Sequence, residues 1–235
     1  MPTGACGAVT RPPTKRCDLV GRVVRLSSWA DVTAAVDSLL VGRRRVLLGV
    51  AGPPGAGKST LAAAVVRHVG ATAVGVPMDG FHLADVELDR LGRHGRKGAI
   101  DTFDAEGYAA LLARLRAETG VVVYAPAFDR GLGQPVAGAV PVPPTARLVV
   151  TEGSYLLDDE PPWPQVAALL DEIWYVHADD DRRRARLVAR HERFGRPPAD
   201  ARAWEQTVDQ PNALRVAASR HRADRVVDLS AFDLP

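Results

Sequence analysis

A stretch of small and polar residues from 52 to 60 carries the strongest chemical signal in the chain. It reads GPPGAGKST and fits the pattern G-x-x-x-x-G-K-[ST] without a mismatch, between an apolar run and a helical pattern. Glycines let backbone N–H groups converge on phosphate oxygens, Lys58 adds a positive charge, and Ser59 can ligate Mg²⁺. We expect a nucleoside triphosphate to contact Gly52, Gly55, Ala56, Gly57, Lys58, Ser59 and Thr60.

Two acidic residues follow predicted strands. Asp79 comes just after an apolar run at 71–76, and Glu152 ends another at 147–151. Ligands of open parallel sheets bind at the carboxyl ends of the strands, so both carboxylates are expected to face the phosphate loop. Asp79 is a candidate base for an attacking hydroxyl, and Glu152 a candidate magnesium ligand. The alternatives are a turn aspartate and a surface glutamate, whereas Asp104 is predicted to be a helix cap.

Arginines recur at helical spacing near residue 185. Arg183, Arg186 and Arg190 are three and four residues apart, so on a helix they share a face and could clamp a transferring phosphoryl group. The alternative is a solvated arginine face, since only three of the 30 basic residues are lysines. No aromatic residues interleave the run, which disfavours nucleic-acid binding.

Strand and helix patterns alternate along the chain and predict an α/β fold, with a mostly parallel sheet covered on both faces. Helices are predicted at 29–40, 58–69, 104–116, 179–193 and 208–222, with a short one at 83–91. Strands are predicted at 45–51, 71–76, 120–124, 147–151 and 173–176, with an edge strand at 226–229 and a loop or hairpin at 129–144. Residues 1–20 are interpreted as a flexible leader, and 21–235 as one domain.

Composition excludes several classes of protein. The 235 residues are 46% hydrophobic and 25% charged, which is typical of a globular protein and not of a disordered or fibrous chain. A net charge of +2 points to neither nucleic acid nor a membrane as partner. Cys6 and Cys17 have no metal-binding spacing and predict free thiols, so the expected location is cytoplasmic. The oligomeric state stays open, with a homodimer as the default.

Several segments, in order, resemble the phosphoribulokinase, uridine kinase and type I pantothenate kinase family over roughly residues 45–230. Besides the phosphate loop they are MDGFH at 78–82, RKGAIDTFD at 96–104, VYAPAFDR at 123–130, VVTEGSYLL at 149–157 and DRRRARLVARH at 181–191. The resemblance implies a P-loop, three-layer α/β/α fold with an arginine-bearing helical lid at about 181–200. It also implies that Asp79 is the catalytic base and that Glu152-Gly153 matches the family's strand-end glutamate.

The acceptor pocket is implied by the same segments. Its expected residues are Asp79, His82, Lys97, Tyr124, Phe128, Asp129, Arg130 and Asn212. Asn212 is included because Trp204 and Asn212 resemble a W…N segment that lines the pantothenate pocket in the family. Uridine kinases carry a histidine or an aromatic residue where this chain has Phe128-Asp129-Arg130, so a polyol or a charged acceptor is also compatible.

These observations predict an ATP- and Mg²⁺-dependent kinase that phosphorylates a hydroxyl of a small metabolite such as a nucleoside, a pantothenate-like compound or a sugar. Asp79, Lys58, Arg186 and Arg190 are the expected catalytic residues, Arg183 a nucleotide contact, and Ser59 with Glu152 the metal ligands. The alternative is an ATP-binding regulatory or assembly switch without an acceptor.

Overall fold

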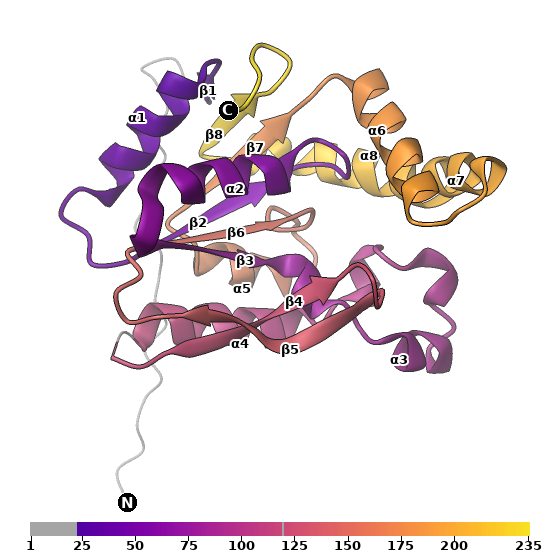
Figure 1. Cartoon of the computed structure of the whole chain (residues 1–235), viewed down its shortest axis with the longest axis horizontal. Helices are drawn as coiled ribbons and strands as arrows, with labels where there is room; N and C mark the ends of the chain where they lie inside the picture. The colour runs from indigo at the N-terminus through magenta and orange to yellow at the C-terminus, as the bar shows by residue number, and fades with distance from the viewer. Residues whose placement is uncertain (1–22, 119) are drawn as a thin grey trace, which may run out of the picture.

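Six parallel strands form the central sheet of the protein (Figure 1). The structure is a computed structural model that describes residues 23–118 and 120–235; the predicted leader, with Cys6 and Cys17, lies outside the described residues. The strand order is β1-β8-β7-β2-β6-β3, and every neighbouring pair is parallel. The strands are β1 (Val24–Leu26), β2 (Val46–Ala51), β3 (Ala73–Pro77), β6 (Leu148–Gly153), β7 (Glu172–His177) and β8 (Arg225–Asp228).

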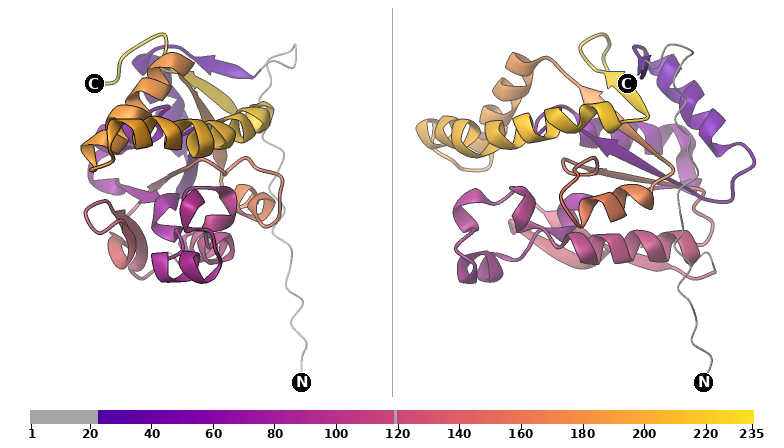
Figure 2. Two further views of the ribbon diagram at one scale, coloured as in Figure 1. Left: turned by 90° about the vertical axis from the view of Figure 1, so that its right-hand side faces the viewer. Right: turned by 180° about the vertical axis from the view of Figure 1, so that it is seen from behind.

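Helices cover both faces of this sheet, as the alternating pattern predicts (Figure 2). Helices α1 (Trp29–Leu40) and α2 (Lys58–Val69) enclose one hydrophobic core with one face. On the other face, a second core includes side chains of α4 (Ala105–Ala117), α5 (Trp163–Ala168) and α8 (Gln210–Ala218). Because the sheet lies between these two cores, its strands β2 and β6 are buried along their whole length. The carboxyl ends of these strands are therefore rigid supports for a site.

Local capping explains why several helices begin where the sequence predicts. The Ser28 side chain accepts a hydrogen bond from the Asp31 N–H at the start of α1. Asp104 does the same for the Gly107 N–H at the start of α4, so its prediction as a cap is confirmed. The short helix predicted at 83–91 is α3 (Asp85–Arg90).

The strand predicted at 120–124 does not join the central sheet. The apolar run at 120–124 was expected in the parallel sheet, but the strand β4 (Val123–Asp129) pairs only with β5 (Gln134–Val142), in a separate antiparallel hairpin. The prediction of a hairpin at 129–144 is confirmed by β5. The hairpin lies beside the central sheet, and its inner residues Val123, Ala125 and Val142 join the core that contains α4 (Figure 1).

The C-terminal third also differs from the prediction. Strand β8 is internal, because β1 pairs with its outer side. The helix expected from 208 instead begins with α7 (Pro198–Trp204), passes through a π-helical turn at Glu205–Asp209 and continues as α8. The predicted helix at 179–193 is α6 (Asp180–Arg193), capped by Asp179. Of the helices that the structure describes, none is both long and apolar enough to cross a bilayer.

Candidate active site

The carboxyl ends of β2, β6 and β3 bring the predicted chemical residues together. Strand β6 lies between the other two, and its Glu152 pairs in register with Val50 of β2 and Pro77 of β3. The phosphate loop leaves the end of β2, and Asp79 follows the end of β3 by two residues. Glu152 is therefore flanked by the loop on one side and by Asp79 on the other.

The phosphate loop requires glycine because of its backbone conformation and its close neighbours. Gly55 and Gly57 have φ values of +78° and +97°, in the left-handed region that L side chains avoid. A Cβ on Gly55 would also lie 2.8 Å from the Arg183 carbonyl oxygen and 2.8 Å from Leu187 Cγ. The loop is thus packed directly against α6, and Gly57 leads into the N-terminus of α2, where a helix favours anions.

Lys58 and Ser59 start α2 and point to neighbours at the end of β6. The Lys58 ammonium donates to the Pro53 carbonyl oxygen (3.2 Å) and to Ser154 Oγ (3.4 Å). Burial lowers the pKa of Lys58, and the negative charges of Glu152 and Asp79 oppose that shift. Ser59 Oγ donates to Glu152 Oε1 at 2.9 Å.

A magnesium ion fits this pair of oxygens. Hydroxyl and carboxylate oxygens are the hard ligands that Mg²⁺ prefers, and Mg²⁺ usually binds one or two protein groups together with substrate phosphates. Burial raises the pKa of Glu152, and the charge of Asp79 raises it further. A buried carboxyl group beside another carboxylate is an environment that a cation would stabilise. Among the residues with described placement, no cluster of three or more acidic, histidine or cysteine side chains could hold a metal, so the remaining ligands of Mg²⁺ would be waters and substrate phosphates.

Asp79 lies in a 3₁₀ turn, Met78–Phe81, that contacts the β4–β5 hairpin. Its carbonyl oxygen accepts from His82 Nδ1 at 2.8 Å. Its carboxylate is one-third exposed and lies 3.9 Å from the guanidinium of Arg130, beyond hydrogen-bond distance. The Asp79 carboxylate is therefore accessible to a ligand and keeps its lone pairs available.

The three arginines of α6 differ in burial and in their partners. Arg183 is 1% exposed and donates to the Pro54 carbonyl oxygen (3.2 Å) and to the Gln210 side chain. Arg186 is exposed. Arg190 is partly buried, and both burial and the nearby charge of Arg130 lower its pKa. The three guanidiniums thus differ in their surroundings, since α6 holds Arg183 against the loop and Arg190 toward the acidic residues; that they jointly clamp a phosphoryl group stays a prediction.

Among the predicted acceptor residues, two aromatic rings lie near Asp79, and two other side chains donate to backbone carbonyl oxygens. The rings of His82 and Phe128 lie 4.9 Å apart between centroids, tilted by 53°, and His82 contacts the Asp79 backbone. Asn212 Nδ2 donates to the Gly98 carbonyl oxygen at 3.4 Å. Lys97 donates to Asp85 and to the Gly133 carbonyl oxygen, so its ammonium joins α3 to the hairpin.

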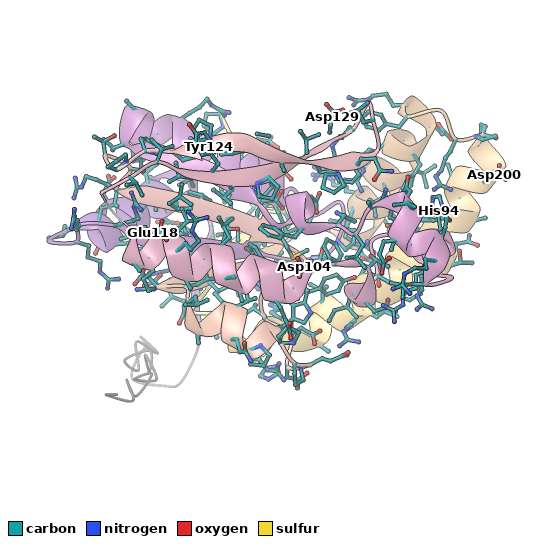
Figure 3. All side chains as sticks on the ribbon, turned by 90° about the horizontal axis from the view of Figure 1, so that it is seen from below. His94, Asp104, Glu118, Tyr124, Asp129 and Asp200 are labelled. Carbon is teal, nitrogen blue, oxygen red and sulfur yellow. The ribbon has the colours of Figure 1, made fainter. Side chains whose placement is uncertain are left out.

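Of two further predicted acceptor residues, one lies away from Asp79 and the other lies at its end of the hairpin. Tyr124 is 61% exposed and sits toward the end of the hairpin opposite to Asp129 (Figure 3). The alternation of β4 turns this ring outward, since its strand neighbours Val123 and Ala125 are fully buried. Asp129 lies at the correct end, but its carboxylate accepts from the Gly131 and Leu132 N–H groups of the hairpin loop. Asp129 therefore stabilises the turn.

Sequence reasoning missed several residues around the site. Ser154, a partner of Lys58, follows Glu152 by two residues, so its place after a strand end was a usable signal. Tyr155 donates to the Gly98 carbonyl oxygen at 2.7 Å, beside Asn212. Asp209 lies in the π-helical turn and is 2.7 Å from His191 Nε2 of α6. No local pattern marks this last contact, which ties the arginine helix to the C-terminal helix.

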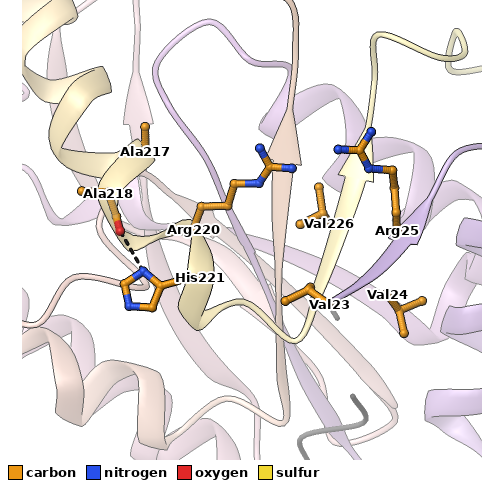
Figure 4. Close-up of a pocket in the computed structure, with 8 residues that line it drawn as sticks. All are labelled: Val23, Val24, Arg25, Ala217, Ala218, Arg220, His221 and Val226. Atoms are coloured by element: carbon orange, nitrogen blue, oxygen red, sulfur yellow. Dashed lines mark hydrogen bonds between the residues drawn. The ribbon is translucent and has the colours of Figure 1, made fainter. Parts of the chain in front are cut away.

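A cavity of about 750 Å³ lies elsewhere, between β1, β8 and the end of α8. Arg25, Arg220 and His221 line it together with small apolar side chains (Figure 4). None of its lining residues belongs to the phosphate-loop site. The chemistry of the candidate site therefore rests on the strand ends and not on this cavity.

A parallel sheet with a phosphate loop after β2 and an acidic strand end beside it is the architecture of P-loop kinases. Comparison with known proteins agrees with this class, although no family model matches the chain. A Schizosaccharomyces pombe protein named "Putative uridine kinase C227.14" is 36% identical over 191 residues, which cover 77% of this chain and 81% of that protein. The "ATP-dependent kinase-like protein notR'" of Aspergillus versicolor is 41% identical over 152 residues, 61% of this chain and 88% of that protein.

A solved structure extends the likeness to the whole fold. The crystal structure of a "putative fructose transport system kinase" from Silicibacter sp. TM1040 has a TM-score of 0.78 and 36% identity, and the match covers 85% of this chain and 98% of that one. The chain belongs to the phosphoribulokinase and uridine kinase family of ATP-dependent P-loop kinases.

Proposed function

We propose that the protein transfers the γ-phosphoryl group of ATP, with Mg²⁺, to a hydroxyl of a small metabolite, and that Asp79 is the base. The observation that carries this proposal is the placement of an accessible carboxylate at the end of β3, one strand away from the Ser59–Glu152 pair. A switch protein needs the phosphate loop but has no use for an accessible carboxylate beside the ring pair of His82 and Phe128.

Each residue has a chemical role in this scheme. Loop N–H groups and Lys58 hold the phosphates, and Ser59 with Glu152 would hold Mg²⁺. Mg²⁺ neutralises charge on the β- and γ-phosphates when bound. Asp79 orients the acceptor hydroxyl and accepts its proton as the oxygen attacks phosphorus. Arg190, on the inward face of α6, stabilises the negative charge of the transferring group.

The lid contributes by excluding water. Helix α6 packs on the phosphate loop through Gly55, and α7 follows it on the same side of the molecule (Figure 1). Closure of α6 and α7 over bound ATP would leave the acceptor hydroxyl as the nucleophile in place of water.

The test measures ADP release with a panel of nucleosides, pantothenate, pentoses, hexoses and ribulose 5-phosphate. We expect one class of acceptor to stimulate release, and Asp79→Asn to lower that turnover about 10²- to 10⁴-fold with ATP affinity nearly unchanged, the usual contribution of a general base. Asp37→Asn, which removes a carboxylate of α1 that contacts His68, is the matched control and should keep full turnover. Full activity of Asp79→Asn contradicts its role, and slow release that no acceptor changes favours the switch.

A further inference from the structure

We infer that the acceptor carries an anionic group, a carboxylate or a phosphate, near the hydroxyl that is phosphorylated, and that Arg130 binds this group. The inference rests on the proposed function and names the class of acceptor that the same site selects. It starts from the position of Arg130 at the end of β4, beside the candidate base (Figure 3 shows its neighbour Asp129 at this end of the hairpin).

The protein does not satisfy the guanidinium of Arg130. A guanidinium has five N–H donors in a planar fork that suits a carboxylate or a phosphate. Within residues 23–118 and 120–235, its one ion-pair contact is Asp79, at 3.9 Å, and no hydrogen bond joins the two. Arg130 is 45% exposed at its side chain, so its donors are accessible to a small molecule at the site.

Other carboxylates near this end of the hairpin are already engaged. Asp129 accepts two N–H groups of the hairpin loop, and Asp85 accepts from Lys97. Asp209, near Arg190, is paired with His191. Lys97 is engaged by Asp85, so among the predicted acceptor residues that the structure describes, Arg130 is the accessible cation that can bind a ligand.

A second positive charge makes an anion more favourable at this position. Arg130 is close enough to Arg190 to lower the pKa of the latter, so two cations repel each other across the site. The proposed function uses Arg190 for the transferring phosphoryl group. An anionic group of the acceptor would neutralise Arg130 in the same way, and the two arginines would then each face their own anion.

Binding of an anion at Arg130 also affects the base. Without it, the Asp79 carboxylate and the Arg130 guanidinium lie 3.9 Å apart and attract each other. An acceptor anion that takes Arg130 would reduce this attraction and leave Asp79 to the hydroxyl. Phe194, at the end of the lid helix α6, lies 6.0 Å from the Arg130 guanidinium, so Arg130 is also at the boundary that lid closure completes.

Matched pairs of acceptors test the inference. Each pair keeps the hydroxyl and removes the charge: glycerate and glycerol, ribose 5-phosphate and ribose, pantothenate and pantothenyl alcohol. We expect at least one anionic member to exceed its neutral partner in kcat/KM by about 10- to 100-fold, the range for a hydrogen bond to a charged group. A preference confined to acids or to phosphate esters identifies which anion Arg130 binds.

The variant Arg130→Gln should abolish that preference by raising KM for the anionic member, while kcat/KM for the neutral member changes by less than about threefold. Arg130→Lys should restore part of the preference, since it keeps the charge without the fork. Arg182→Gln, which removes an exposed charge of α6, controls for surface electrostatics. The inference is overturned if the enzyme uses both members of every pair equally, or if Arg130→Gln lowers kcat equally for both members. Arg130 would then be a residue that orients Asp79. If no acceptor stimulates ADP release, the kinase function itself fails at this site.

Discussion

The buried arginine of α6, Arg183, gives a prediction with a calculable size. Arg183→Met keeps an unbranched apolar stem and removes the guanidinium, which donates to the Pro54 carbonyl oxygen and to Gln210. A hydrogen bond from a charged group contributes about 1.5–3 kcal/mol, so two of them, one of them long, amount to about 3 kcal/mol. The contact with Asp180 adds little, because that carboxylate is 64% exposed. For a chain of this length, about 3 kcal/mol lowers Tm by about 6–12 °C.

Urea and thermal unfolding without nucleotide measure this loss, because bound ATP would stabilise the folded state by itself. Arg182→Met, the exposed neighbour, is the control and should shift Tm by less than about 2 °C. ATP affinity should fall in Arg183→Met as well, since Pro54 belongs to the phosphate loop. A variant that keeps its Tm but loses ATP binding would refute the reasoning, and would make Arg183 the direct nucleotide contact that its spacing suggests.

Two further predictions concern packing and pH. Gly80→Ala places a Cβ 2.5 Å from the backbone oxygen of Pro126. We expect the free energy of unfolding in urea to fall by about 1–3 kcal/mol, and turnover to fall as well. The control Gly75→Ala, whose methyl has one neighbour at 4.0 Å, should be tolerated. Burial opposes ionisation of Asp158, but hydrogen bonds from Arg215 and the Glu160 N–H lower its pKa below 3.8 overall. A carboxylate with a depressed folded pKa stabilises above its unfolded pKa, so the free energy of unfolding should fall as the pH drops below about 4, less steeply in Arg215→Gln.

Local signals predicted the elements that hold the nucleotide. Residues 29–40 and 58–69 are helices with the bounds that the sequence predicts, because a capping serine and the phosphate loop fix their first turns. The β4–β5 hairpin could not be predicted as separate from the sheet. An apolar run specifies a buried strand, while its hydrogen-bonding partner depends on the tertiary fold.

The same division applies to the site. Glu152 and Asp79 lie together because the carboxyl ends of neighbouring parallel strands meet, which the sequence pattern contains. The contrast between Arg183 and Arg186 does not follow from spacing alone, since both satisfy the helical period and only packing against the loop distinguishes them. Tyr124 was placed at the site by its segment, whereas strand alternation turns it outward.

The separate hairpin has a consequence for how such a kinase could diversify. Strands β3 and β6 are neighbours in the sheet, and the 70 residues numbered 78–147 form one excursion between them. This excursion holds Asp79, Lys97 and Arg130, whereas the phosphate loop, Glu152 and α6 lie outside it. In the proposed function, the base and Arg130 are thus encoded in one stretch of the gene, and the phosphate-binding residues are encoded outside it. A recombination event that replaced the excursion alone could exchange one acceptor for another while the ATP machinery stayed intact.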